Sequence, residues 1–155
     1  MHRRSRIAVM PVPADINPRI VEALYGDALV LADELRLRFG GDFRAEGDAA
    51  RQVALSCEGL RATTRTMHCL AWLLNHRAFF AGEISEFQLR RHGRLPAALP
   101  SGDLTRLPED AARLVRLSER LFARVERLER AWRRDDAADG PSAIERLRER
   151  LAAAS

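Results

Sequence analysis

One stretch of the chain, residues 53–84, constrains the fold more than any other. Small or apolar residues recur along it at alternating spacings of four and three, which is the pattern of one helix face, and no proline interrupts it. A helix from about Asp48 to Ala81 would be roughly 50 Å long, too long to stand unsupported in a small domain. We therefore expect other helices to pack along the face formed by Val53, Cys57, Leu60, Thr64, Met67, Ala71, Leu74, Ala78 and Ala81.

From Met67 onward a second apolar stripe lies on the opposite side of the same helix. Upstream, that side carries the charged residues Glu58 and Arg65, so we interpret it there as mostly solvent-facing. The C-terminal half is apolar on two sides, which predicts that it lies between two layers, formed by helices of this chain or by a partner subunit. The residues expected to pack between layers or in a dimer are Cys69, Trp72, Leu73, His76, Phe79 and Phe80.

Composition and charge fit one soluble domain. The chain has 155 residues, of which 46% are hydrophobic and 31% charged, and its net charge of +4 comes without dense basic blocks. Cys57 and Cys69 fall within one helix, too far apart to bond to each other, so we expect reduced thiols and a cytoplasmic protein. The apolar run at 7–10 is stopped by Pro11 and Pro13, which argues against a secretion signal or a membrane span.

Capping signals divide the rest of the chain into helices. Asn17, which precedes a proline, predicts a helix that runs to about Phe39. Asp48 is expected to cap the long central helix. A third long helix is predicted to begin at Pro108, with acidic residues in its first turn and an apolar stripe that keeps the three-and-four spacing as far as Trp132.

The predicted fold is all-α: a three-helix bundle with long antiparallel helices and a short C-terminal amphipathic helix. We interpret residues 1–16 as a disordered arm, residues 17–134 as the bundle, and residues 135–155 as a linker and a short amphipathic tail. A short helical turn capped by Ser85 and a loop rich in proline and glycine connect the second long helix to the third. The tail begins with a capping box at Ser142 and either folds back on the bundle or orders on binding a partner.

Residues that could carry chemistry are few. His68, Cys69 and His76 invite a metal interpretation. However, the two histidines would lie about 80° apart around the helix, and Cys69 and His76 roughly 10 Å apart along it. The threonines at 63–66 have no neighbouring base, and the chain has no glycine-rich phosphate loop and no paired acid motif. We predict no catalytic, cofactor-binding or metal-binding residues, and no enzyme activity.

Two surfaces are candidates for docking partners. The third helix carries nine arginines and five acids between residues 106 and 134, most of which we interpret as a solvated, salt-bridged face. A line of arginines on this helix could dock an acidic partner, and the apolar face of the tail is the second candidate. The residues of these surfaces are Arg120, Arg124 and Arg127 for the line, and Ile144, Leu147 and Leu151 for the tail.

The central helix resembles the core block of the regulator of CtrA degradation family, small proteins of alpha-class proteobacteria. The pieces that carry the resemblance are LRATTRTM at 60–67, WLLNHRA at 72–78 and GE at 82–83. The resemblance implies a dimeric three-helix bundle without a catalytic site. It also implies an adaptor that helps the ATP-dependent ClpXP protease to degrade the cell-cycle regulator CtrA, together with other adaptors and a cyclic-di-GMP binding partner.

We therefore expect a cytoplasmic, homodimeric, non-enzymatic adaptor that uses no cofactor. Its expected partners are a ClpX-type unfoldase and its protease, other adaptors and the substrate regulator. The alternative is a DNA-associated helical regulator that uses the basic third helix. Salt would discriminate the two, because phosphate binding by several arginines weakens steeply between low and moderate salt.

Overall fold

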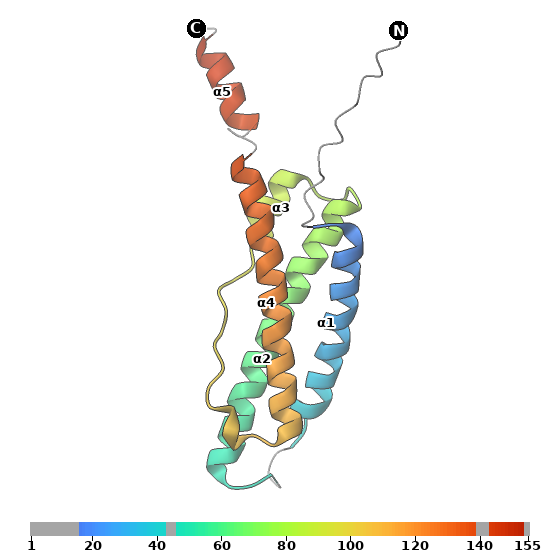
Figure 1. Cartoon of the computed structure of the whole chain (residues 1–155), viewed down its shortest axis with the longest axis vertical. Helices are drawn as coiled ribbons and strands as arrows, with labels where there is room; N and C mark the ends of the chain where they lie inside the picture. The colour runs from blue at the N-terminus through green and yellow to red at the C-terminus, as the bar shows by residue number, and fades with distance from the viewer. Residues whose placement is uncertain (1–15, 43–45, 139–142, 154–155) are drawn as a thin grey trace, which may run out of the picture.

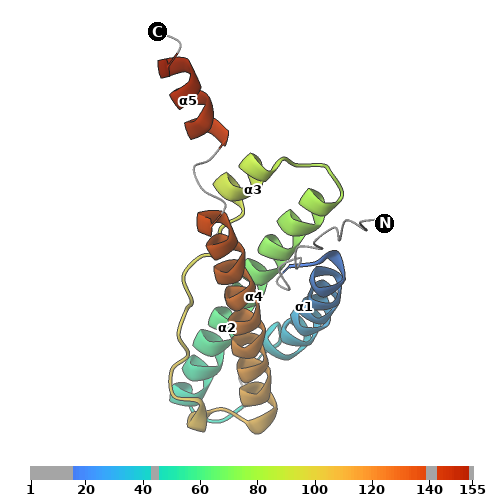
Figure 2. The ribbon, with the colours of Figure 1, turned by 45° about the horizontal axis from the view of Figure 1, so that its top comes forward.

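The computed structural model describes residues 16–42, 46–138 and 143–153, and within these ranges the fold is all-α without a strand (Figure 1). The long helices α1, α2 and α4 lie side by side, and the views of Figures 1 and 2 agree on this arrangement. None of the described helices combines the length and the apolar composition that a membrane crossing needs. The elements in order are α1 (Pro18–Phe39), α2 (Ala49–Phe80), α3 (Glu86–His92), the 3-10 helix η1 (Leu104–Arg106), α4 (Glu109–Ala138) and α5 (Ala143–Ala153).

The helices begin at the predicted capping residues. The side chains of Asn17 and Asp48 each accept a hydrogen bond of 2.9 Å from the backbone N–H three residues further on. These bonds satisfy amides that have no partner inside the first helical turn. Ser85 and Gln88 form a reciprocal capping box at the start of α3. At its C-terminal end, α4 continues through Ala138 rather than ending at residue 134 as predicted.

The core lies where α1, α2 and α4 face one another. The predicted stripe of α4 is buried from Ala111 to Val125 and half-buried at Leu128 and Trp132. Apolar burial of this kind is the main source of stability in a helical bundle. The predicted stripe of α1 is buried at every position, namely Val21, Leu24, Ala28, Leu31 and Leu35.

The face of α2 that points into the core is the opposite of the one predicted. Leu55, Ala62 and Cys69 are completely buried, and the charged residues Glu58 and Arg65 between them are only 3% and 2% exposed. The interpretation of the upstream part of this side as mostly solvent-facing is therefore wrong. The large side chains of the face that we expected to form the core are instead exposed: Val53 62%, Leu60 70%, Met67 53% and Leu74 46%.

The physical reason lies in Glu58 and Arg65. A buried charged side chain whose hydrogen bonds are satisfied by other segments cannot be told from a surface residue by local pattern. The outer face of α2 carries no such interruption, so it shows the more regular apolar period. The regularity of the apolar pattern therefore did not show which face of α2 the bundle buries.

The residues expected between layers or in a dimer lie mostly inside the chain's own bundle. Cys69, Trp72, Leu73 and His76 are all buried, and Phe79 is half-buried. Trp72 and His76 are in the part of α2 that packs against α4. Only Phe80, which is 38% exposed, leaves a large part of its side chain on the surface.

Candidate functional site

A buried polar cluster holds the connection between α3 and α4 against the bundle. Arg65 donates from Nε and Nη2 to Ser118 Oγ at 3.1 and 3.0 Å, and from Nη1 to the Leu99 carbonyl at 2.6 Å. Glu58 Oε1 accepts from the backbone N–H of Gly102 at 2.7 Å. The connection, which runs as an extended trace along the bundle in Figure 1, is thus fixed here through its main chain.

The guanidinium of Arg65 is buried without a carboxylate partner among the described residues. Its hydrogen bonds go to a hydroxyl and a carbonyl, both neutral. Burial lowers the pKa of Arg65, because desolvation penalises the charged form. A group of this kind fixes one arrangement of the segments around it, since removing any acceptor would leave a buried donor unpaired.

An aromatic cluster lies at the α3 end of the bundle. The ring of His76 stacks on Trp72 with 3.7 Å between centroids and meets the edge of Trp132 at 5.4 Å. The guanidinium of Arg90 from α3 lies 5.3 Å from the centre of the Trp132 ring. Burial lowers the pKa of His76 and outweighs its hydrogen bond to the Trp72 carbonyl. The cluster ties α2, α3 and α4 together around a neutral imidazole.

The structure brings no set of metal ligands together among the residues that it describes. Cys69 is completely buried, and burial raises its pKa to about 12, so its thiol stays protonated near neutral pH. Cys57 lies on the opposite side of α2 and is exposed. The two thiols therefore lie on different sides of α2, one exposed and one buried.

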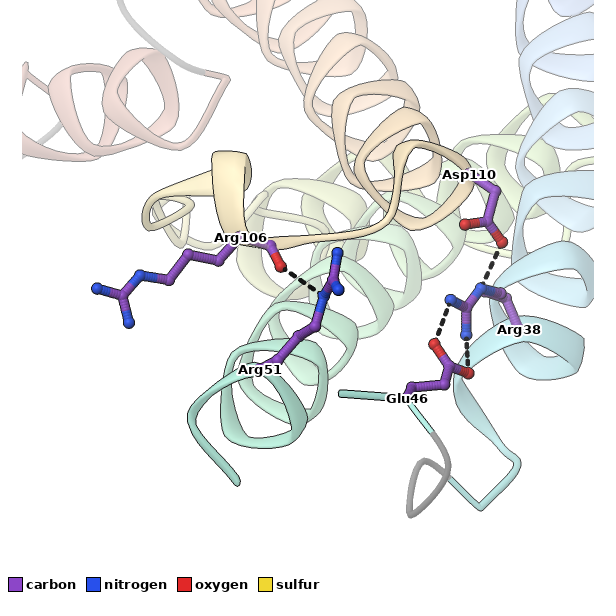
Figure 3. Close-up of polar contacts among 5 residues, drawn as sticks. All are labelled: Arg38, Glu46, Arg51, Arg106 and Asp110. Carbon is purple, nitrogen blue, oxygen red and sulfur yellow. Dashed lines mark hydrogen bonds and ion pairs between the residues drawn. The ribbon is translucent and has the colours of Figure 1, made fainter. Parts of the chain in front are cut away.

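A third polar cluster closes the other end of the bundle (Figure 3). Arg38 at the end of α1 donates to both carboxylate oxygens of Glu46, at 3.0 and 2.8 Å, and to Asp110 of α4 at 2.6 Å. The hydrogen bond from Arg38 holds the pKa of Asp110 below its usual value. Arg51 of α2 donates to the Arg106 carbonyl at 3.1 Å. These contacts join residues 38–51 to residues 106–110, which are distant in sequence, so the cluster holds the fold together.

The predicted arginine line is on the surface of α4. Arg120, Arg124 and Arg127 are all exposed, and the first two border a cavity of about 450 Å³ between α4 and α1. Arg124 Nη1 is 3.9 Å from a carboxylate oxygen of Asp27, and Glu34 of α1 borders the same cavity. Acidic residues beside the line would oppose a phosphate backbone, which weighs against the DNA-binding alternative.

The predicted tail surface lies on α5, which Figures 1 and 2 place beyond the end of α4. Leu147 and Leu151 are 57% and 62% exposed. The side chain of Ile144 lies outside the described residues, as do residues 1–15, which include most of the predicted N-terminal arm, and Ser142 of the predicted capping box. The two described leucines thus present an apolar surface, as the amphipathic pattern predicted.

A further apolar surface follows the outer face of α2. Beside it, a cavity of about 660 Å³ is bordered by Leu60 and Met67 of α2 and by Phe39 of α1. A second cavity, of about 400 Å³, is bordered by Leu74 and by the start of α1. Sequence reasoning found the residues of this face but assigned them to the core. We call this surface the α2 seam and define it as Val53, Cys57, Leu60, Thr64, Met67, Ala71, Leu74 and Ala78.

Comparison with known proteins gives one match. Residues 13–155 match a protein family whose description reads "Protein of unknown function (DUF1465)". No curated protein and no solved structure matches the chain.

Proposed function

We propose that this chain, which belongs to the DUF1465 family of proteins of unknown function, is a non-enzymatic adaptor of the regulator of CtrA degradation type. In this proposal it is a cytoplasmic homodimer that assists ClpXP-type proteolysis of a cell-cycle regulator such as CtrA. The observation that carries the proposal is the exposure of large apolar side chains in rows on long helices, with Leu60 of the α2 seam 70% exposed. Rows of this kind are typical of surfaces that bind other proteins.

The residues that carry the family resemblance also build both faces of α2. The segment 60–67 supplies Leu60 and Met67 to the α2 seam and Arg65 to the buried polar cluster. The segment 72–78 supplies His76 to the aromatic cluster. A conformationally fixed helix with an apolar outer face suits an adaptor, because a rigid surface loses little entropy on binding.

An adaptor of this kind needs no chemistry of its own. It would raise the local concentration of substrate at the protease by binding both, while the unfoldase supplies the energy from ATP. The arginine line would speed approach to an acidic partner, since charge mainly affects the association rate. The exposed Leu147 and Leu151 of α5 would then strengthen binding to the partner.

The test is a reconstituted degradation assay with ClpXP, the companion adaptors, purified CtrA and the full chain. Addition of the chain is expected to accelerate the degradation of CtrA until the binding sites for the chain on the protease are saturated. Reversing the charge of Arg120, Arg124 and Arg127 to glutamate should reduce that acceleration. A matched control reverses three other exposed arginines, Arg19, Arg91 and Arg134, and should retain it. An unchanged rate with and without the chain would contradict the proposal.

A further inference from the structure

The connection between α3 and α4 exposes an unbroken series of apolar side chains. Pro96, Ala97, Ala98, Leu99 and Pro100 are all exposed, although none of these side chains carries a polar group. Sequences that fold well avoid apolar series of this length on a surface unless they have a function. The connection returns from α3 to the start of α4 at the other end of the bundle (Figure 1), which explains its length but not its composition. We call residues 96–100 the apolar run.

Burial along the connection has a period of three. Between residues 94 and 107, every residue is exposed except Leu95, Ser101, Leu104 and Leu107, which are half-buried or buried. These four belong to one series of third positions, whose remaining member, Ala98, has only a methyl side chain. Three residues per turn is the repeat of the polyproline II helix, in which every third residue lies along the same edge. The segment 95–101 therefore lays one edge on the bundle and presents the other two to solvent.

Two prolines favour this extended conformation. Pro96 and Pro100 each hold their own φ near about −65°, and each disfavours the helical region for the leucine that precedes it. Because residues three apart share an edge, Pro96 with Leu99 forms one solvent-facing edge, and Ala97 with Pro100 forms the other. At about 3.1 Å per residue, the apolar run is roughly 12 Å long. It presents two short apolar ridges side by side.

Buried charged side chains hold the apolar run through main-chain groups in it and on either side of it. The bonds run from the Leu95 N–H to Glu129 at 2.8 Å, from Arg65 to the Leu99 carbonyl at 2.6 Å, and from the Gly102 N–H to Glu58 at 2.7 Å. The three charged side chains are at most 9% exposed. None of these bonds uses a side chain of the apolar run, so its apolar groups stay available. A segment that is already ordered loses little conformational entropy when a partner binds it.

We propose that the apolar run is a docking site for a partner protein that takes a polyproline II segment into a shallow groove lined with aromatic side chains. This inference goes beyond the proposed function and does not depend on it. Grooves of this kind pack aromatic rings against prolines and their apolar neighbours, and they gain affinity because the extended helix is already formed. Recognition by strand pairing is disfavoured, since Pro96 and Pro100 have no N–H to donate to a ladder.

The charge beside the apolar run adds to the description of the partner. Arg94, two residues before the run, is exposed. A carboxylate at the matching end of the partner's groove would pair with this guanidinium and fix the direction in which the segment binds. The partner is therefore expected to combine aromatic and acidic residues in one groove.

The first test is photo-cross-linking with the full chain. The photo-reactive residue benzoylphenylalanine replaces Ala97 in one sample and Val30 of α1, which is 62% exposed, in the control. Both are irradiated in a lysate of the cells that naturally express the chain. A partner is expected to be cross-linked from position 97 and not from position 30, and mass spectrometry should place the link in a groove lined with aromatic residues. The absence of a partner specific to position 97, or a link to a surface without aromatic residues, would overturn the proposal.

The second test titrates the purified cross-linked protein with the full chain. Ala97→Glu combined with Leu99→Glu should weaken binding at least about 10-fold and leave helix content by circular dichroism unchanged, because both side chains are exposed. The matched control, Val30→Glu with Leu37→Glu on α1, should bind as the wild type does, since its residues are 62% and 66% exposed far from the connection in sequence. Equal binding by the wild type and the 97/99 variant would overturn the proposal.

Two further variants in the same titration test the mode of recognition. Pro96→Ala combined with Pro100→Ala should weaken binding at least about 10-fold, because the prolines favour the extended helix and contact the aromatic rings. A proline variant that binds as tightly as the wild type, or more tightly, would assign strand pairing instead and overturn the proposal. Arg65→Met should weaken binding several-fold, because it frees the Leu99 carbonyl and disorders the run. A synthetic peptide of residues 93–103 should compete with the full chain but bind more weakly, and equal affinities would show that the bundle does not order the run.

Discussion

The two faces of α2 show how one helix can serve two kinds of contact. The inner face mixes Leu55, Ala62 and Cys69 with the buried charges Glu58 and Arg65. Arg65 hydrogen-bonds to α4 and to the α3–α4 connection, and Glu58 accepts from that connection and from Arg61 of α2 itself. The outer face, the α2 seam, carries no charge, and its large side chains are exposed in a single chain. Buried hydrogen-bonding groups fix one fold, whereas a regular apolar seam can accept a separate copy. The comparison teaches that the regularity of an apolar pattern does not by itself show which face of a helix the bundle buries.

The largest expected difference between the faces is in core packing. Leu55→Ala should lower the free energy of unfolding by about 2–5 kcal/mol, because Leu55 is completely buried and leaves a cavity. Leu74→Ala, which we first expected to cost as much, should cost less than about 1 kcal/mol in a monomer, because Leu74 is 46% exposed. Both are to be measured by denaturant unfolding at the same low protein concentration. An equal loss of unfolding free energy in the two variants would contradict the assignment of Leu55 to a buried face and Leu74 to an exposed one.

A second difference concerns the buried charge. Arg65→Met should cost about 1–3 kcal/mol, because Ser118 and the Leu99 carbonyl lose their donor while remaining buried or partly buried. Arg120→Met, on the exposed surface of α4, should change stability by less than about 0.5 kcal/mol. Denaturant midpoints of the two variants give the comparison. If Arg65→Met left the stability unchanged, the polar cluster would not be what holds the α3–α4 connection in place.

Glycines at two positions offer a third comparison. A Cβ at Gly59, on the inner side of α2, would lie 2.5 Å from the Phe39 ring, so Gly59→Ala should destabilise by about 1–3 kcal/mol. A Cβ at Gly26 in α1 would meet nothing within 4 Å, so Gly26→Ala should stabilise by about 0.5–1 kcal/mol through helix propensity. Thermal melting of the two variants should move in opposite directions. A stabilising Gly59→Ala would show that Phe39 moves aside freely.

The smallest expected effect is a pH dependence from the inner face. Because burial lowers the pKa of His76 below its ordinary value of 6.5, the unfolded chain binds this proton at a higher pH than the folded chain does. Stability should therefore decline as the pH falls below about 6.5, until the folded-state imidazole is itself protonated. His76→Gln should reduce this decline between about pH 7 and pH 5, followed by denaturant unfolding at each pH. An identical slope in both proteins would show that other groups cause it.

Local patterns sufficed for α1 and α4 but not for α2. Asn17, Asp48 and Ser85 cap helices as predicted, because a cap depends on residues three positions away. The inner face of α2 depends on distant partners instead. Arg65 is 53 positions from Ser118, and Glu58 is 44 positions from Gly102. The local sequence of α2 carries no signal of these long-range contacts. Glu58 and Arg65 were therefore interpreted as surface residues although they are buried.

Among the candidate surfaces, too, those that depend on one helix were predicted correctly and the one that depends on neighbouring helices was not. The arginine line and the leucines of α5 are exposed as the amphipathic patterns predicted, since those patterns concern one helix at a time. The α2 seam was predicted from its period to be a core face, whereas the structure leaves its large side chains exposed. A heptad specifies a kind of contact and not the segment that makes it, so the period alone could not show that the bundle leaves this face uncovered.

The most direct measurement of the central claim uses the two native cysteines, one on each face of α2. Thiol labelling of the folded, reduced chain is followed at Cys57 and Cys69 separately by mass spectrometry, over a range of protein concentrations. Cys69 should stay unlabelled until the chain unfolds, because it is buried with a pKa of about 12. Cys57 should react readily in the folded chain, because it is exposed on the outer side of α2. Labelling of Cys69 as fast as Cys57, or protection of Cys57 in the folded chain at low concentration, would contradict the account.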